Sequence, residues 1–131
     1  MTETEINTTF LSYARAMTVS VVLLTLGQAS TGLSSAYGYE TGPSHAWSAQ
    51  LGLIACLGVV VFVMMSKTDN SKLKGMSFGL LVAWLIQYGM GEMFENMTWI
   101  SLIHGIIAMG ILLHGMALVR AFSEEKPTTS V

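Results

Sequence analysis

Four apolar stretches, each long enough to cross a membrane, make up most of this 131-residue chain. They span about residues 16–37, 45–66, 75–94 and 98–121, and the only Lys, Arg or Asp within them is Arg120, next to the end of the last stretch. A hydrocarbon core about 30 Å thick is crossed by about 20 apolar residues in a helix, and each stretch reaches that length. Because a backbone in lipid must satisfy its own hydrogen bonds, each stretch is predicted to be a helix.

The balance of charged and hydrophobic residues supports the same class. Only 11% of the residues are charged and 52% are hydrophobic, whereas soluble domains carry about 25% charged residues. The stretches therefore lack the charged stripes that the helices of a soluble bundle present to water. We predict an integral membrane protein in contact with the lipid bilayer, and the absence of a basic patch argues against a nucleic-acid partner.

Every basic residue flanks the same side of the four stretches: Arg15, Lys67, Lys72, Lys74, Arg120 and Lys126. Since cytoplasmic loops are enriched in Lys and Arg, both termini are predicted to be cytoplasmic in a multi-pass protein of the cell membrane. Short links make successive helices antiparallel, which predicts an all-α, up-down-up-down four-helix bundle over residues 14–122. Residues 1–13 are expected to form a polar N-terminal segment and residues 123–131 a disordered tail.

The chain also contains an internal repeat of its polar positions. A shift of 59 residues places Gln28 on Gln87, Gly32 on Gly91, and His45 on His104. This match predicts two helical hairpins related by a pseudo-twofold axis along the membrane normal. In each hairpin the Gln and Gly are four residues apart and share one helix face. They could form a small-residue packing surface with a polar clamp, or the wall of a pocket for a flat ligand.

The two equivalent histidines are the candidate metal ligands. His45 opens the second helix and His104 lies about two turns into the fourth, so both fall near the outer membrane face. Imidazoles on facing helices of a bundle suit axial ligation of a haem iron. We therefore expect both to bind haem b, with Gln28, Gly32, Gln87 and Gly91 shaping the pocket and Trp47 packing on the macrocycle. The pair could instead hold copper, or each His could simply hydrogen-bond a neighbouring helix.

Other polar and aromatic residues have less specific interpretations. His114 lies about 15 Å beyond His104 along the same helix and cannot serve the same iron. We expect it to form an interhelical hydrogen bond, with a second metal site or a proton relay as alternatives. Glu92 and Glu95 are expected to be solvated acids near the outer mouth. The tryptophans Trp47, Trp84 and Trp99 are expected to be anchors at the membrane interface.

These motifs resemble those of the heme A synthase family over about residues 14–122. Gln87-Tyr-Gly-Met-Gly91, followed after a turn by His104-Gly-Ile-Ile-Ala108, is similar to the family's Gln-x-x-x-Gly hairpin and its His-x-x-x-Ala segment. The first hairpin, with Glu40 preceding His45, resembles the family's arrangement of an acidic residue before the histidine. The resemblance implies haem ligation between the second and fourth helices and a catalytic role for Glu40. The chain corresponds to one of the two bundles that family members generally contain.

These observations predict a membrane haem-b protein that acts in electron transfer or in haem modification. Modification would make it an oxidoreductase, and could require a second bundle from a homo-oligomer. The alternative is a non-catalytic small subunit of a larger respiratory or oxygenase membrane complex, in keeping with the small size of the chain. A third possibility, a small proton-coupled exporter, would depend on Glu92.

Overall fold

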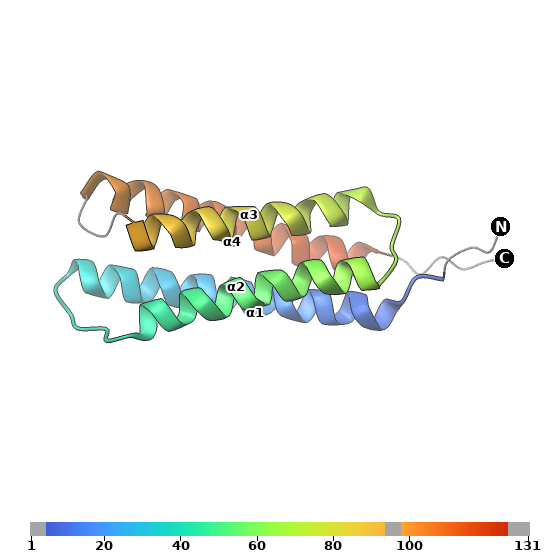
Figure 1. Cartoon of the computed structure of the whole chain (residues 1–131), viewed down its shortest axis with the longest axis horizontal. Coiled ribbons are helices and arrows are strands. Elements are labelled where there is room, and N and C mark those ends of the chain that lie inside the picture. Colours follow the sequence, from blue (N-terminus) through green and yellow to red (C-terminus); the bar gives the residue numbers. More distant parts are fainter. Residues whose placement is uncertain (1–4, 94–97, 126–131) are drawn as a thin grey trace.

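The computed structural model describes residues 5–93 and 98–125, which form four helices and no strand. These are α1 (Thr8–Ala36), α2 (Ser44–Met65), α3 (Ser71–Met93) and α4 (Thr98–Glu124). They lie lengthwise in one elongated bundle, and successive helices run in opposite directions (Figure 1). The predicted all-helical class is therefore confirmed.

Three of the four helices, α1, α2 and α4, are long and apolar enough to cross a membrane. Among the described residues, α3 does not reach the same hydropathy, because Lys72, Lys74 and Gln87 lie within it. Its 23 residues still measure about 34 Å at 1.5 Å per residue, which is long enough to span a bilayer. Three of the four predicted stretches are thus confirmed as helices that are long and apolar enough to cross a membrane.

The first helix begins earlier than the sequence pattern indicates. The predicted span starts near residue 16, but α1 begins at Thr8. Asn7 is the N-cap, and its side-chain oxygen accepts hydrogen bonds from the backbone N–H groups of Thr9 (3.1 Å) and Phe10 (3.2 Å). An Asn in this position satisfies donors that the first helical turn leaves unpaired. Much of the predicted polar segment 1–13 is therefore helical.

The last helix runs to Glu124, so the predicted tail 123–131 is helical at its start. Glu125, which follows, binds the turn between α2 and α3. Its carboxylate accepts hydrogen bonds from Thr68 Oγ1 at 2.8 Å and from Asn70 Nδ2 at 2.6 Å. The remainder of the predicted tail and Lys126 lie outside the described residues, as does the predicted outer turn at 95–97.

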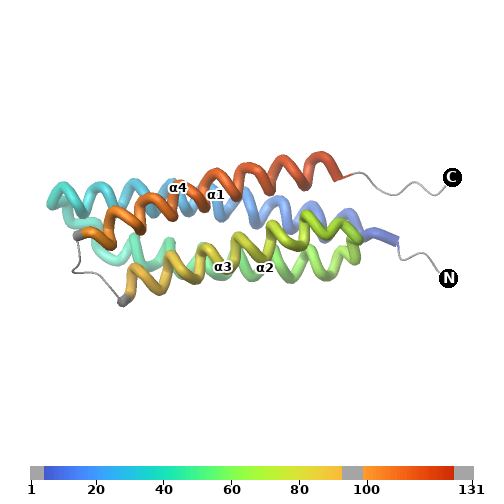
Figure 2. Tube along the Cα trace, turned by 90° about the horizontal axis from the view of Figure 1, so that it is seen from above, coloured from blue at the N-terminus to red at the C-terminus, as the bar shows by residue number. Residues whose placement is uncertain are grey.

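Each helix packs against two neighbours. The pairs α1–α2, α2–α3, α3–α4 and α1–α4 are in contact, and Figure 2 shows α1 beside α4 and α3 beside α2. The helices α2 and α4 therefore lie diagonally opposite each other. Side chains that point inward from these two helices meet across the middle of the bundle.

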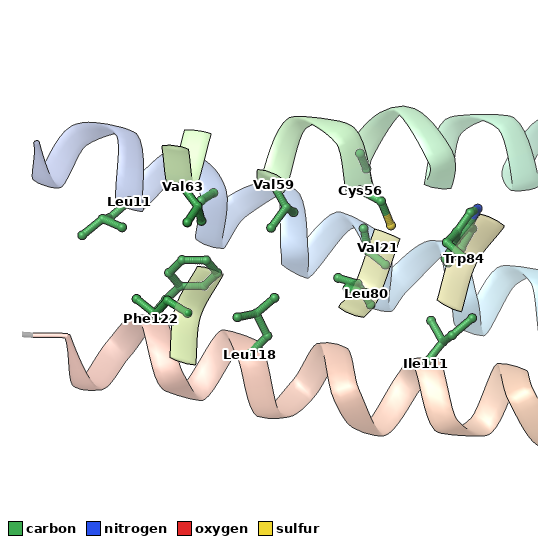
Figure 3. Packing of buried hydrophobic residues seen from close by; sticks show 13 residues of the cluster. Leu11, Val21, Cys56, Val59, Val63, Leu80, Trp84, Ile111, Leu118 and Phe122 are labelled. Carbon is green, nitrogen blue, oxygen red and sulfur yellow. The ribbon is translucent and has the colours of Figure 1, made fainter. Parts of the chain in front are cut away.

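Buried apolar side chains fill one half of the bundle, which we call the core half (residues 5–25, 52–84 and 108–125). Helices on all sides contribute to this cluster (Figure 3). Its members are Leu11, Ala14, Val21, Ala55, Cys56, Val59, Val63, Leu73, Leu80, Trp84, Ile111, Leu118 and Phe122. The turn between α2 and α3 and the described basic residues belong to this same half of the molecule.

Trp84 occupies the end of this core, and its prediction as an interface anchor was wrong. Its side chain is only 3% exposed, and its indole Nε1 donates to the carbonyl of Ala49 at 3.0 Å. A Cβ on Gly52 would lie 1.9 Å from the ring, so only glycine leaves room for the indole there. The space that Gly52 leaves and the hydrogen bond to the Ala49 carbonyl together allow the large amphipathic indole of Trp84 to be buried.

The opposite half, which we call the histidine half, comprises residues 26–51, 85–92 and 99–107. Residues 26–51, all of them described, contribute no buried hydrophobic side chain. In the rest of the histidine half only Gln87 and Ile100 are buried. The apolar core thus ends at Trp84. Beyond it, in the histidine half, polar residues form the contacts between helices.

Candidate functional site

His45 and His104 lie close together in the histidine half. Their ring centroids are 6.4 Å apart and their planes are inclined by 43°. His45 is in the first turn of α2 and His104 is in α4, the helix diagonally opposite. The diagonal placement lets two half-buried rings approach each other across the bundle, although the residues are far apart in sequence.

The two glutamines hold the backbone of the helices that carry these rings. Gln28 of α1 donates its Nε2 hydrogen bonds to the carbonyl of His45 and to Ser48 Oγ (2.7 Å). Gln87 of α3 donates through Nε2 to the carbonyl of His104 at 2.9 Å. The interpretation of each glutamine as a polar clamp is confirmed, and the clamped group is the histidine's backbone carbonyl.

The glycines of the same motifs lie directly against the imidazole rings. A Cβ on Gly32 would be 3.4 Å from His45 Cε1, and a Cβ on Gly91 would be 3.5 Å from His104 Cε1. Each ring therefore rests on the backbone of the preceding helix, and a side chain larger than methyl would push it away. In each Gln-x-x-x-Gly motif, the Gln thus hydrogen-bonds the backbone of the histidine, and the Gly leaves space for its ring.

Thr31 supplies a hydrogen-bond partner for the ring of His45. Its Oγ1 lies 2.9 Å from His45 Nδ1 and 2.9 Å from the carbonyl of Gly27. A hydroxyl can donate one hydrogen bond and accept others, so Thr31 can donate to the Gly27 carbonyl while it accepts from a protonated Nδ1. In that arrangement the lone pair of His45 Nε2 is available to a metal or to another donor.

His104 has no such support. Its Nδ1 is buried and has no hydrogen-bond partner among residues 5–93 and 98–125. The Oε1 atom of Gln87 is likewise buried without a partner in the described part of the chain. In the shift of 59 residues, Thr31 corresponds to Met90 and Ser48 to Ile107, so the second hairpin lacks both hydroxyls. The histidines match in position but differ in the polar groups around them.

The sequence interpretation did not identify Thr31 and Ser48 as site residues. A signal was present, because Thr31 follows Gln28 by three residues and shares its helix face. Ser48 stands three residues after His45 in the same way. Hydroxyl residues are common in membrane helices as partners of their own backbone, however, and nothing in the sequence alone shows which of them reach a neighbouring helix.

The structure does not bring the other predicted site residues to the pair of rings. Trp47 is 62% exposed, and it lies two residues after His45, which turns it to a different side of the helix. Glu40 is exposed in the segment between α1 and α2, and no hydrogen bond within the described residues joins it to His45. Glu92 is exposed near the end of α3, and Glu95 lies outside the described residues.

His114 has a separate role in the core half. Its Nε2 donates to the carbonyl of Met76 on α3 at 2.8 Å, and its ring lies against Gly79. The predicted interhelical hydrogen bond is confirmed. His114 therefore provides an internal reference, because it is a partly buried histidine on the same helix as His104 with a purely structural contact.

The donor set of the candidate site is two imidazoles. In the described part of the chain, no cluster of three or more His, Cys, Asp or Glu side chains could hold a metal ion. A metal bound between these imidazoles would therefore need ligands from outside this set of side chains. Comparison of the chain with protein-family models, with curated proteins and with solved structures finds no match.

Proposed function

We propose that this chain is a membrane haem-b protein in which His45 and His104 are the two axial ligands of the iron. The distance between the rings carries this proposal. An iron held in line between two imidazole nitrogens, each at about 2 Å, separates the ring centroids by about 6 Å. The centroids of His45 and His104 are 6.4 Å apart, which is the separation that such ligation requires.

The chemistry of the donor set fits haem better than a bare ion. Two imidazoles leave a free ion under-coordinated, whereas a porphyrin supplies four further nitrogens in the plane between the axial ligands. With iron bound to His45 Nε2, the Nδ1 atom would carry the proton and donate it to Thr31 Oγ1, which lies 2.9 Å away. The bound haem would supply one-electron chemistry, and the protein would hold, orient and shield it.

The histidine half also offers a suitable environment for an apolar macrocycle. Its helices are largely apolar, yet residues 26–51 place no hydrophobic side chain in a packed interior. A porphyrin between the two hairpins would contact the helices of the histidine half. It would there take the part that packed apolar side chains have in the core half. Gly32 and Gly91 keep the backbones of α1 and α3 clear of any bulk beside the rings.

The asymmetry of basic residues supports a position of this haem toward the outer membrane face. The described Lys and Arg residues belong to the core half, so that half would face the cytoplasm together with both termini. All four helices would then cross the cell membrane as two related hairpins. A haem in this position suits electron transfer. Haem modification, as the resemblance to heme A synthase implies, would require substrate haem and a role for Glu40.

The test is the absorption spectrum of the detergent-purified protein, oxidised and then reduced. We expect a Soret band and the sharp reduced α band of a six-coordinate, low-spin b-type haem. His45→Ala and His104→Ala should each abolish that six-coordinate spectrum. His114→Ala is the matched control and should leave it unchanged, because His114 binds only the Met76 carbonyl. A low-spin spectrum that survives His104→Ala would disprove the assignment of that ligand.

A colourless preparation that takes up no haem would favour the alternative, a small subunit of a larger membrane complex. The exposed apolar side chains of α2 and α4 are compatible with such contacts. Co-purification with large membrane partners would then identify the complex. Copper in place of iron in elemental analysis would point to the same two imidazoles with a different metal.

A further inference from the structure

The two histidines of the proposed haem site have different hydrogen-bonding environments. His45 Nδ1 is hydrogen-bonded to Thr31 Oγ1 at 2.9 Å, whereas His104 Nδ1 is buried and has no partner among the described residues. The difference follows from the sequence, since Met90 stands where the shift of 59 residues would place a second threonine. One ring is therefore oriented by a hydrogen bond through its second nitrogen, and the other is not.

A hydrogen bond to the second nitrogen of a metal-bound imidazole fixes the ring's orientation and raises its basicity. Removal of such a partner commonly weakens metal binding by about 10–100-fold. His45 has this support and His104 lacks it. An iron held between them would therefore bind His45 more strongly than His104.

Gln87, which binds the backbone of His104, also carries a buried polar atom without a partner in the described residues. Its side chain is 9% exposed, its Nε2 is bonded to the His104 carbonyl, and its Oε1 is buried without a partner within residues 5–93 and 98–125. Its counterpart Gln28 has an additional partner, Ser48 Oγ. A buried amide oxygen without a partner is unfavourable, so this oxygen is an available acceptor beside His104. The two buried side-chain nitrogen or oxygen atoms without a hydrogen-bond partner in the described residues thus belong to His104 and to Gln87, which binds the His104 backbone.

We infer that His104 is an exchangeable iron ligand, and that a small molecule such as carbon monoxide can take its place while His45 keeps the haem bound. This inference rests on the proposed function. In the exchange the iron–nitrogen bond to His104 breaks, a bond from iron to the small ligand forms, and no electron is transferred. Gln87 Oε1 can accept a hydrogen bond from a ligand that carries a proton, such as water. The site would thus sense or bind a small ligand, in addition to carrying electrons.

Carbon monoxide on the reduced, haem-loaded protein is the direct probe. We expect a shifted Soret band as carbon monoxide replaces His104. His104→Ala should retain a five-coordinate haem that binds carbon monoxide readily, whereas His45→Ala should lose most of its haem. A protein without haem would refute the proposed function itself. A six-coordinate haem that does not bind carbon monoxide, or the reverse behaviour of the two variants, would refute only the inequality of the ligands.

Met90 provides the finer test. Met90→Thr introduces at this position the hydroxyl that Thr31 supplies to His45, and should lower the affinity for carbon monoxide about tenfold. Met90→Leu is the matched control without a hydroxyl and should leave the affinity unchanged. Thr31→Val removes the support from His45 and should lower haem retention. Circular dichroism of each variant checks the helical fold. Equal affinities in Met90→Thr and Met90→Leu would contradict the role assigned to this position.

Discussion

The two halves of this bundle are held together in different ways. In the core half, buried side chains from all four helices interlock around Val59, Leu80 and Leu118. In the histidine half, the specific contacts between helices include hydrogen bonds from Gln28 and Gln87, the Thr31–His45 hydrogen bond, and the approach of two rings to two glycines. Trp84 lies at the boundary, where it is packed on Gly52 and bonded to Ala49.

This difference separates stability from function along the bundle axis. Packing of complementary side chains and small residues is what drives helices together in a membrane, where lipid is as apolar as the side chains. The core half has such packing and should hold the fold by itself. The histidine half has fewer packed side chains, and polar contacts fix its two rings. It should therefore be the half whose stability depends on a bound ligand.

Trp84 should give the largest loss of stability. Trp84→Ala removes a buried indole and its hydrogen bond to Ala49, and large-to-small changes of this kind cost about 3 kcal/mol or more. Trp99→Ala in the histidine half, where the side chain is 63% exposed, should change stability by no more than about 0.5 kcal/mol. The measurement is the free energy of unfolding in mixed micelles. Equal losses in the two variants would contradict the distinction between the halves.

Haem should stabilise the histidine half specifically. A ligand at about 100 times its Kd adds about 2.7 kcal/mol to the stability of the state that binds it. We expect hydrogen exchange of the amides in residues 26–51 to slow on addition of haem, while residues 52–65 in the core half change little. Equal slowing in both halves would show that the bundle responds to haem as one unit.

Gly52 should be sensitive to a single added methyl group. In Gly52→Ala the new Cβ would lie 1.9 Å from the Trp84 ring, which forces the indole to move at a cost of about 1–3 kcal/mol. Gly75→Ala is the matched control on α3, because a Cβ there meets nothing within 4 Å. Thermal unfolding followed by circular dichroism compares the two. A Gly52→Ala protein as stable as Gly75→Ala would show that Trp84 is not held in the position described.

His114 should give the smallest effect, and one confined to stability. His114→Ala removes the hydrogen bond to the Met76 carbonyl and should cost about 1 kcal/mol, the usual net contribution of an interhelical hydrogen bond. Its haem spectrum should remain that of the unmodified protein. A spectral change in this variant would indicate that the core half and the haem site are coupled.

Much of the fold follows from the sequence. The four apolar stretches predict the four helices, and the matched positions of His45 and His104 predict that the rings lie at similar depth. The helix ends were less predictable. Asn7 extends α1 by a local N-cap to Thr9 and Phe10, whereas Glu125 bonds to Thr68 and Asn70, which only the folded chain brings near. Trp84 was misassigned because tryptophan is common both at membrane interfaces and in buried packing.

The residues of the candidate site were also only partly predictable from the sequence. The spacing of Gln28, Gly32 and His45 identified residues that the structure brings together, whereas Thr31 and Trp47 could not be placed. The reason is that the helices are apolar on all sides, so the pattern of hydrophobic residues does not show which face turns inward. Backbone hydrogen bonding in lipid and chain length determined by themselves that this protein is helical and suited to a membrane. Only the tertiary structure decided that two imidazoles face each other across a diagonal and that just one of them is held by a hydroxyl, because those contacts depend on how each helix is rotated against its neighbours.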